Sequence, residues 1–199
     1  MQAQKPLPAS YHFDKTLDLS KTRTVLWLNL AALPLLVLFG WIFGRIFFLL
    51  RSINPISGGF WDLFTLSIGE LIWLILSIIF MLFFHELLHG LFFWLYTHER
   101  PKFALKSGYA FAAAPDWYLP KFQYILVGLS PLVIISVICV LLAAFMPSQV
   151  IPYLLLVATF NAAGALGDMI IVAWVSSQPR DILLRDQGDK FSIFVPNIE

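Results

Sequence analysis

Four long apolar runs, separated by short polar stretches, dominate the chain. They cover residues 24–50, 66–96, 122–146 and 150–176. A helix needs about 20 consecutive apolar residues to cross a bilayer, so each run is long enough for one crossing. The connections RSINPISGGFWD and MPSQV hold proline and serine, which end helices. The pattern predicts an all-α polytopic membrane protein with four transmembrane helices, in a single membrane domain.

Polar stretches flank and divide these runs. The leader at 1–23 precedes a first run that is too long for a signal-peptide core and lacks a small-residue cleavage site, so we interpret that run as a retained span. Within the 97–121 loop, KFALKSGYAFAAAP alternates apolar residues around Lys-Ser-Gly, which indicates a short β-hairpin over 103–113. An amphipathic segment lying on the membrane surface is the open alternative for this loop.

Composition supports the membrane interpretation. Hydrophobic residues make up 59% of the 199 residues and charged residues only 13%, which is outside the range of soluble domains. A formal net charge of +1 gives no reason to expect a nucleic-acid partner. Cys139 is the only cysteine, so an intramolecular disulfide is excluded and a cysteine-based metal site is not expected.

The positive charges predict an orientation. Lysine and arginine gather in the leader, in the 97–121 loop and in the tail at 177–199, and only Arg45 and Arg51 depart from this bias. Cytosolic segments carry the excess of these residues. We therefore expect both termini and the 97–121 loop to lie in the cytosol, and the lipid bilayer to be a partner of the chain.

The second run contains three polar residues with a metal-site spacing. FFHELLHGLFFW holds His85, Glu86 and His89 as an HExxH motif. Helical positions four apart share a face, so both imidazoles can reach one ion while Glu86 stays beside it. Zinc suits neutral imidazole, and a glutamate beside a zinc site can act as general base in hydrolysis. The alternative is that the histidines only hydrogen-bond neighbouring helices.

A hydrolytic zinc also needs a third protein ligand, and Asp168 has the right depth. At the rise of a helix, Asp168 lies about 12 Å from the cytosolic end of the fourth run, and His89 and His85 lie roughly 10 and 16 Å from that of the second. Glu70 is about 22 Å from His85 along the same helix, which is too far. The alternative role for Asp168 is that of a structural partner to a buried donor.

The stretch NAAGALGD places Asn161 seven residues before Asp168, on the same helical face. Asn161 could hydrogen-bond a substrate carbonyl or a developing oxyanion, so it is a candidate catalytic residue beside Glu86. We interpret Gly164 and Gly167, between them, as positions where small residues let helices pack closely.

With HELLHG on one helix and NAAGALGD on a later one, residues 80 to 175 resemble the intramembrane zinc metalloproteases of the site-2 protease class. They are most similar to small bacterial membrane zincins with four spans. The resemblance implies a bacterial cytoplasmic membrane protein with Zn²⁺ on His85, His89 and Asp168 and with Glu86 as the catalytic glutamate. It matches Asn161 to the asparagine of the Asn-x-x-Pro-x-x-x-Leu-Asp-Gly pattern. This chain departs from that pattern, since Gly164 replaces the proline, the Asn-to-Asp spacing is seven, and Met169 replaces the final glycine.

The expected function is zinc-dependent hydrolysis of peptide bonds in or near the membrane, with the site near the cytosolic side. The resemblance further implies that a β-hairpin near the site, here 103–113, offers its edge to an extended membrane protein or peptide substrate. Two other classes stay open at this point. A metal-ion transporter could use the same ligands, and a catalytically inactive scaffold would keep the helix packing without needing Glu86.

Overall fold

The computed structural model of the chain describes residues 2–51, 67–106 and 109–197. These residues form two compact units, and each is described by itself. Unit 1 comprises Met1–Leu30, Glu86–Ser130 and Leu166–Glu199, and unit 2 comprises Ala31–His85 and Pro131–Ala165.

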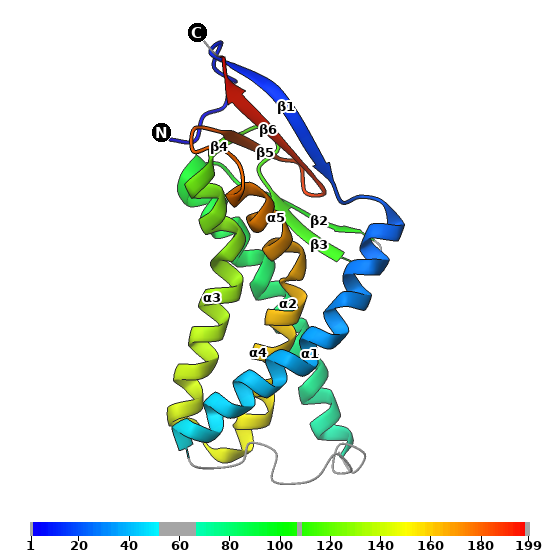
Figure 1. The fold of residues 1–199 in the computed structure, drawn as a ribbon. Helices are drawn as coiled ribbons and strands as arrows, with labels where there is room; N and C mark the ends of the chain where they lie inside the picture. The colour runs from blue at the N-terminus through cyan, green and yellow to red at the C-terminus, as the bar shows by residue number, and fades with distance from the viewer. Residues whose placement is uncertain (1, 52–66, 107–108, 198–199) are drawn as a thin grey trace. The chain divides into compact units, whose positions relative to one another are not determined.

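Five α-helices make up most of the described chain (Figure 1). They are α1 (Thr22–Arg51), α2 (Ile68–Thr97), α3 (Lys121–Phe145), α4 (Ile151–Gly164) and α5 (Leu166–Ser176). The helices α1, α2 and α3 are each long and apolar enough to cross a membrane. The helices α4 and α5 are interrupted at Ala165. Taken together they are also long and apolar enough to cross a membrane, as a broken span or a re-entrant loop. These helices coincide, within two residues at each end, with the four apolar runs of the sequence.

Both ends of α2, which carries the HExxH motif, have local capping interactions. Glu70 accepts a hydrogen bond from the main-chain N–H of Ser67 at 2.8 Å, and its own N–H donates to Ser67 Oγ at 3.3 Å, which is a capping box. Glu70 thus has a structural role at the start of the helix. At the other end, His98 has a left-handed φ of 55° and donates its N–H to the carbonyl of Trp94 at 2.7 Å, which ends the helix.

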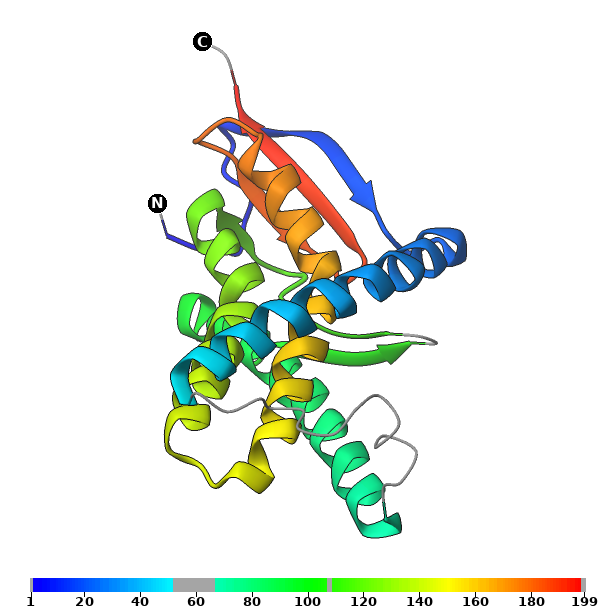
Figure 2. The same cartoon turned by 60° about the horizontal axis from the view of Figure 1, so that its bottom comes forward.

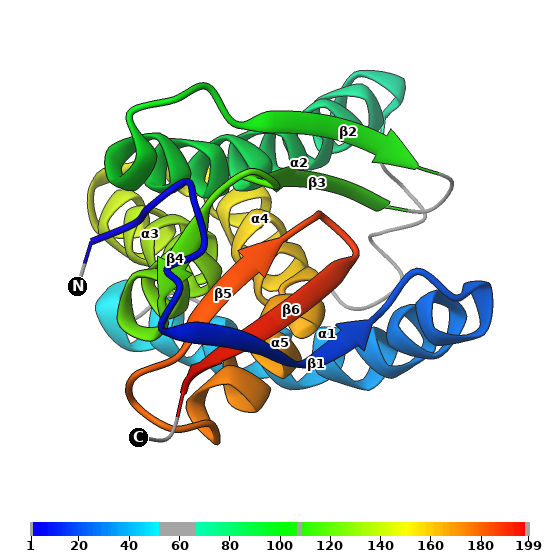
Figure 3. The same ribbon diagram turned by 90° about the horizontal axis from the view of Figure 1, so that it is seen from above.

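The described chain is mostly helical, as expected, but it is not all-α, because unit 1 also contains a four-stranded antiparallel sheet. Its strands are β1 (Tyr11–Asp18), β6 (Lys190–Pro196), β5 (Leu183–Asp186) and β4 (Tyr118–Pro120), in the order β1-β6-β5-β4 (Figure 3). They come from the leader, the 97–121 loop and the tail, which the sequence presents as polar connections. The sheet pairs the first and last described segments of the chain.

One face of this sheet packs against helices to form the core of unit 1. Figure 2 shows α5 lying along β5 and β6. Apolar residues of α2, α3, α5 and the sheet share this core: Phe93, Tyr124, Val127, Ile171, Val175, Leu184 and Ile193. Their removal from water is the main source of stability in this unit.

Unit 2 is a helical packing of apolar side chains. Phe43 and Phe47 of α1 are buried, and Gly40 of the same helix approaches the side chain of Thr159 on α4. The Arg51 guanidinium at the end of α1 donates to the carbonyl of Ala143 on α3 at 3.3 Å. These contacts tie α1 to α3 and α4.

The predicted hairpin is confirmed as β2 (Lys102–Lys106) paired with β3 (Tyr109–Ala113). Its turn, residues 107–108, lies outside the described residues. The ring of Phe103 packs onto Gly90, where an added Cβ would lie 2.4 Å from Phe103 Cζ. Because Gly90 directly follows His89, this contact places β2 beside the HExxH turn of α2. Figure 3 shows β2 next to α2.

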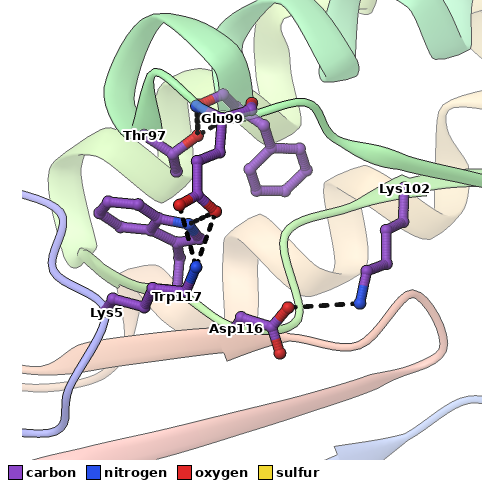
Figure 4. Close-up of polar contacts among 7 residues, drawn as sticks. Lys5, Thr97, Glu99, Lys102, Asp116 and Trp117 are labelled. Atoms are coloured by element: carbon purple, nitrogen blue, oxygen red, sulfur yellow. Dashed lines mark hydrogen bonds and ion pairs between the residues drawn. The ribbon is translucent and has the colours of Figure 1, made fainter.

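Polar contacts fix the base of the hairpin and the start of the chain (Figure 4). The Lys5 ammonium donates to both carboxylate oxygens of Glu99 at 2.9 and 3.0 Å, and Trp117 Nε1 donates to the same carboxylate at 3.0 Å. Lys102 pairs with Asp116 across the base at 3.3 Å. These groups are exposed, so each pair contributes little stability, and they link the start of the chain and the segment before β4 to the residues between α2 and β2.

A candidate metal centre

The HExxH turn lies in the middle of an unbroken helix. The side chains of His85 and His89 are buried, and Glu86 is half-buried. The histidines lie one turn apart on α2, so the helix itself, rather than the placement of the two units, sets them on one face. Glu86 lies about 100° round the helix from His85.

In unit 1, two contacts fix the ring of His89. Its Nδ1 lies 2.9 Å from the main-chain carbonyl of Val127 on α3, and its Nε2 lies 3.4 Å from Asp168 Oδ2 on α5. A carbonyl oxygen only accepts hydrogen bonds, so this contact assigns the proton to Nδ1. The tautomer leaves Nε2, on the side of Asp168, as the ligand atom for a metal.

In unit 2, Asn161 fixes the ring of His85 in the same way. Its side-chain oxygen lies 3.0 Å from His85 Nδ1, and its amide nitrogen donates to the carbonyl of Pro131 at 3.2 Å. Asn161 is fully buried. An amide oxygen accepts only, so His85 also carries its proton on Nδ1, and its Nε2 is the candidate ligand atom.

The side chains of His85, His89 and Asp168 lie close enough together to bind one metal ion. One ligand atom from each of His85, His89 and Asp168 lies within 4.8 Å of the other two. Two imidazoles and one carboxylate are a ligand set that zinc accepts, with the carbonyl and amide contacts as the second shell. The described residues therefore bring together the three side chains that the sequence predicts as metal ligands, and Glu86 lies in the same helical turn.

The break between α4 and α5 places Asp168 in the first turn of α5, where the helix dipole favours a negative charge. Gly164 and Gly167 lie on either side of this break. The interpretation of these glycines as close-packing positions is wrong for the described chain, because no heavy atom lies within 4 Å of a Cβ built at either one. They stand where the helix is interrupted, so packing does not explain them.

The main-chain carbonyl of Val127 belongs to the site, although no sequence motif includes Val127. The carbonyl of Val127, which holds His89, also accepts the hydroxyl of Ser130 at 2.8 Å. Pro131, four residues after Val127, is the one sequence feature that points to this carbonyl. A proline has no N–H, so it leaves the carbonyl four residues earlier without its helical donor.

A buried carboxylate stands at the edge of the unit 1 core. Asp186 of β5 accepts the hydroxyl of Tyr124 at 2.8 Å and the N–H of Gly188 at 2.6 Å. Burial raises the pKa of Asp186 to about 6, although both hydrogen bonds lower it. The sequence gives no sign that this aspartate, in a polar tail, is buried.

Comparison with known families adds an independent line of evidence. Residues 78–183 match a family described as "Putative zincin peptidase". The matched stretch runs from α2 to β5 and contains the HExxH turn, Asn161 and Asp168. No curated protein and no solved structure gives a significant match to the chain. Since the matched residues make up more than half of the 199, the chain belongs to this zincin peptidase family.

Proposed function

We propose that this protein hydrolyses peptide bonds of substrates in or beside the membrane, with zinc held by His85, His89 and Asp168. The observation that carries the proposal is the group of these three side chains, with ligand atoms within 4.8 Å of one another, on the HExxH turn of α2 and the first turn of α5. Membership of a zincin peptidase family supports the same chemistry. The three apolar helices of spanning length support a place in the membrane like that of the site-2 protease class.

The donor set fits zinc rather than a harder cation. Calcium and magnesium prefer oxygen ligands, whereas two neutral imidazoles with one carboxylate are typical of a hydrolytic zinc that keeps a position for water. Both histidines have their Nδ1 engaged, by Val127 and Asn161, which leaves Nε2 of each ring as the atom available to a metal.

Zinc, when bound, lowers the pKa of a water and polarises the substrate carbonyl. The chain supplies the remaining steps. Glu86, in the same turn as the ligands, takes the proton of the attacking water and then gives it to the leaving amine, which is general base and then general acid catalysis. The buried protein around it excludes other water and so strengthens these charge interactions.

For Asn161, the contacts support a role in orienting His85. Its oxygen and nitrogen are already engaged by His85 and by the Pro131 carbonyl. Stabilisation of an oxyanion by Asn161 stays a prediction, and it would require the amide to exchange one of these partners during the reaction.

The hairpin gives the substrate a place to bind. Among the residues that the structure describes, strand β2 pairs with β3 and with no other strand, and its described side chains are exposed. Because Phe103 packs on Gly90, the strand lies beside the metal-binding turn, about 10 Å from the end of α2. At that depth in a bilayer, unpaired N–H and C=O groups are costly. An unwound substrate segment that adds to β2 as a strand would satisfy both backbones and present its peptide bond to the site.

The proposal places the site toward the cytosol. The segments that join the sheet and the hairpin carry most of the lysine and arginine residues, which is typical of the cytosolic side. Water for the hydrolysis would enter from there, since a helical substrate has to be locally unwound before it can be attacked.

The test is cleavage of fluorescein-labelled casein, a largely unfolded protein probe, by purified protein in detergent. Wild type should cleave it, and Glu86→Gln should reduce the rate by about 10² to 10⁴ while keeping its zinc. Glu70→Gln, on the same helix but at its far end, should keep the wild-type rate. Cleavage by Glu86→Gln at the wild-type rate would contradict the assigned role of Glu86. Zinc binding without any cleavage by wild type would favour a metal-ion transporter or an inactive scaffold.

A further inference from the structure

Helix α3 contains a proline, Pro131, well inside its length. In an α-helix the N–H of each residue donates to the carbonyl four residues earlier, and proline cannot make this bond. The carbonyl affected by Pro131 is that of Val127. The helix itself therefore cannot supply the usual donor to Val127.

This same carbonyl is the partner of His89. The distance from His89 Nδ1 to Val127 O is 2.9 Å, and both groups are buried in unit 1. The second lone pair of the oxygen is used by Ser130 Oγ at 2.8 Å. A carbonyl has room for two donors, so the helical N–H of a non-proline residue at position 131 would compete with His89 or Ser130.

We propose that Pro131 is a positioning residue of the metal site, which reserves the Val127 carbonyl for His89 and so fixes the imidazole with Nε2 on the side of Asp168. The inference rests on the zinc site proposed above. The polar partner of a metal-binding imidazole sets both its tautomer and its orientation, and the loss of such a partner typically weakens metal binding 10 to 100-fold.

Two explanations of Pro131 predict different effects of its replacement by alanine. Proline inside a helix destabilises the helix relative to a residue whose N–H can donate. If Pro131 were only a bend in α3, replacing it by alanine should stabilise the fold and leave zinc binding alone. If Pro131 positions His89, the same replacement should weaken zinc binding without lowering the stability of the metal-free protein.

The experiment compares Pro131→Ala with wild type, with zinc affinity measured by competition against a chelator of known affinity and thermal unfolding measured on metal-free protein. The matched control is Pro34→Ala, since Pro34 also lies inside an apolar helix, α1. We expect a zinc Kd about 10 to 100-fold higher for Pro131→Ala, an unchanged zinc Kd for Pro34→Ala, and a metal-free Tm for Pro131→Ala at or above that of wild type.

Three results would overturn the inference. Equal zinc affinity of Pro131→Ala and wild type would show that Pro131 has no part in the site, while leaving the proposed function intact. A metal-free Tm for Pro131→Ala well below that of wild type would show that the proline serves packing. Absence of zinc binding in wild type would remove the proposed function and this inference together.

Discussion

The two histidines of the candidate metal site each have a hydrogen-bond acceptor at Nδ1 that orients the imidazole. The amide of Asn161 holds His85, and the carbonyl of Val127 holds His89. A side-chain oxygen orients the histidine of one turn of α2, and a main-chain oxygen orients the histidine of the next turn. Only the first of these can be removed by truncating a side chain.

Asn161→Ala should therefore weaken zinc binding. Loss of the amide leaves His85 Nδ1 without its acceptor and removes the donor to the Pro131 carbonyl, so we expect a Kd about 10 to 100-fold higher, by chelator competition. Thr159→Ala, on the same helix and also buried, is the matched control and should keep the wild-type Kd. An unchanged affinity of Asn161→Ala would refute the orienting role.

Asp186 should make stability depend on pH. Its pKa is about 6 in the folded protein against an ordinary 3.8, so the folded state holds the proton more tightly than the unfolded chain. The resulting stabilisation is complete below about pH 4 and is lost as pH rises through about 6, by at most about 3 kcal/mol.

The measurement is the free energy of unfolding of metal-free protein between pH 4 and 7, because a bound cation would itself lower the pKa of a nearby carboxyl. Asp186→Asn cannot ionise and should lack the decline seen in wild type between about pH 4 and 6. The same pH slope in both proteins would mean that other groups cause it. Asp116→Asn, at an exposed carboxylate, should behave as wild type.

At the scale of the elements, the helices were predictable and the sheet was not. An apolar run of spanning length has few structural options in lipid, so the ranges of α1, α2 and α3 follow directly from it. The strands β1, β5 and β6 have 4 to 8 residues and lie in the segments that flank the apolar runs. Yet KFSIFVP alternates around the buried Phe191 and Ile193, just after Gly188 with its φ of 94°, and this was a usable hairpin signal.

The candidate site shows a similar division. HExxH and a carboxylate at equal depth were enough to select His85, His89 and Asp168, because helical spacing and rise translate directly into position. Pro131 indicates that the Val127 carbonyl lacks its helical donor, but the sequence does not predict which side chain donates to that carbonyl instead. Pairing of β1 with β6 joins residues far apart in sequence, and no local pattern specifies such a contact.

The contact of the hairpin with α2 gives a test at this scale. Gly90→Ala would place a methyl group 2.4 Å from Phe103 Cζ, so the Phe103 ring has to move off the HExxH turn and β2 loses this contact with α2. We expect faster hydrogen exchange of the β2 and β3 amides in Gly90→Ala and recovery in the double variant with Phe103→Ala. Gly44→Ala, where an added Cβ meets nothing within 4 Å, is the control. Hairpin exchange as slow in Gly90→Ala as in wild type would show that this contact does not hold β2.

At the scale of the whole molecule, the sheet restricts the membrane topology. Strand β1 precedes α1 and strand β6 follows α5, and they pair along their length, with Phe13 opposite Phe194. In a membrane-inserted protein both strands would then lie on one side of the membrane. Three crossings would put them on opposite sides, so we expect α4 and α5 together to form a fourth crossing.

A protease should consequently reach tags at the two ends of the chain from the same side of the membrane. In inside-out vesicles, which expose the cytosolic face, a protease should remove both an N-terminal and a C-terminal tag, and in right-side-out vesicles it should remove neither, given the excess of lysine and arginine in these segments. Removal of one tag only would mean an odd number of crossings and would exclude the β1–β6 pairing in the membrane-inserted protein.

The most direct test of the account is the zinc content of the purified protein in detergent, by elemental analysis. The account predicts about one zinc per chain in wild type and a sharp loss in both His89→Ala and Asp168→Asn, because each removes a ligand of a three-residue site. His98→Ala and Asp116→Asn, at exposed positions, should keep the wild-type content. Wild type without zinc, or ligand variants that retain it in full, would contradict the metal centre on which the proposed hydrolysis depends.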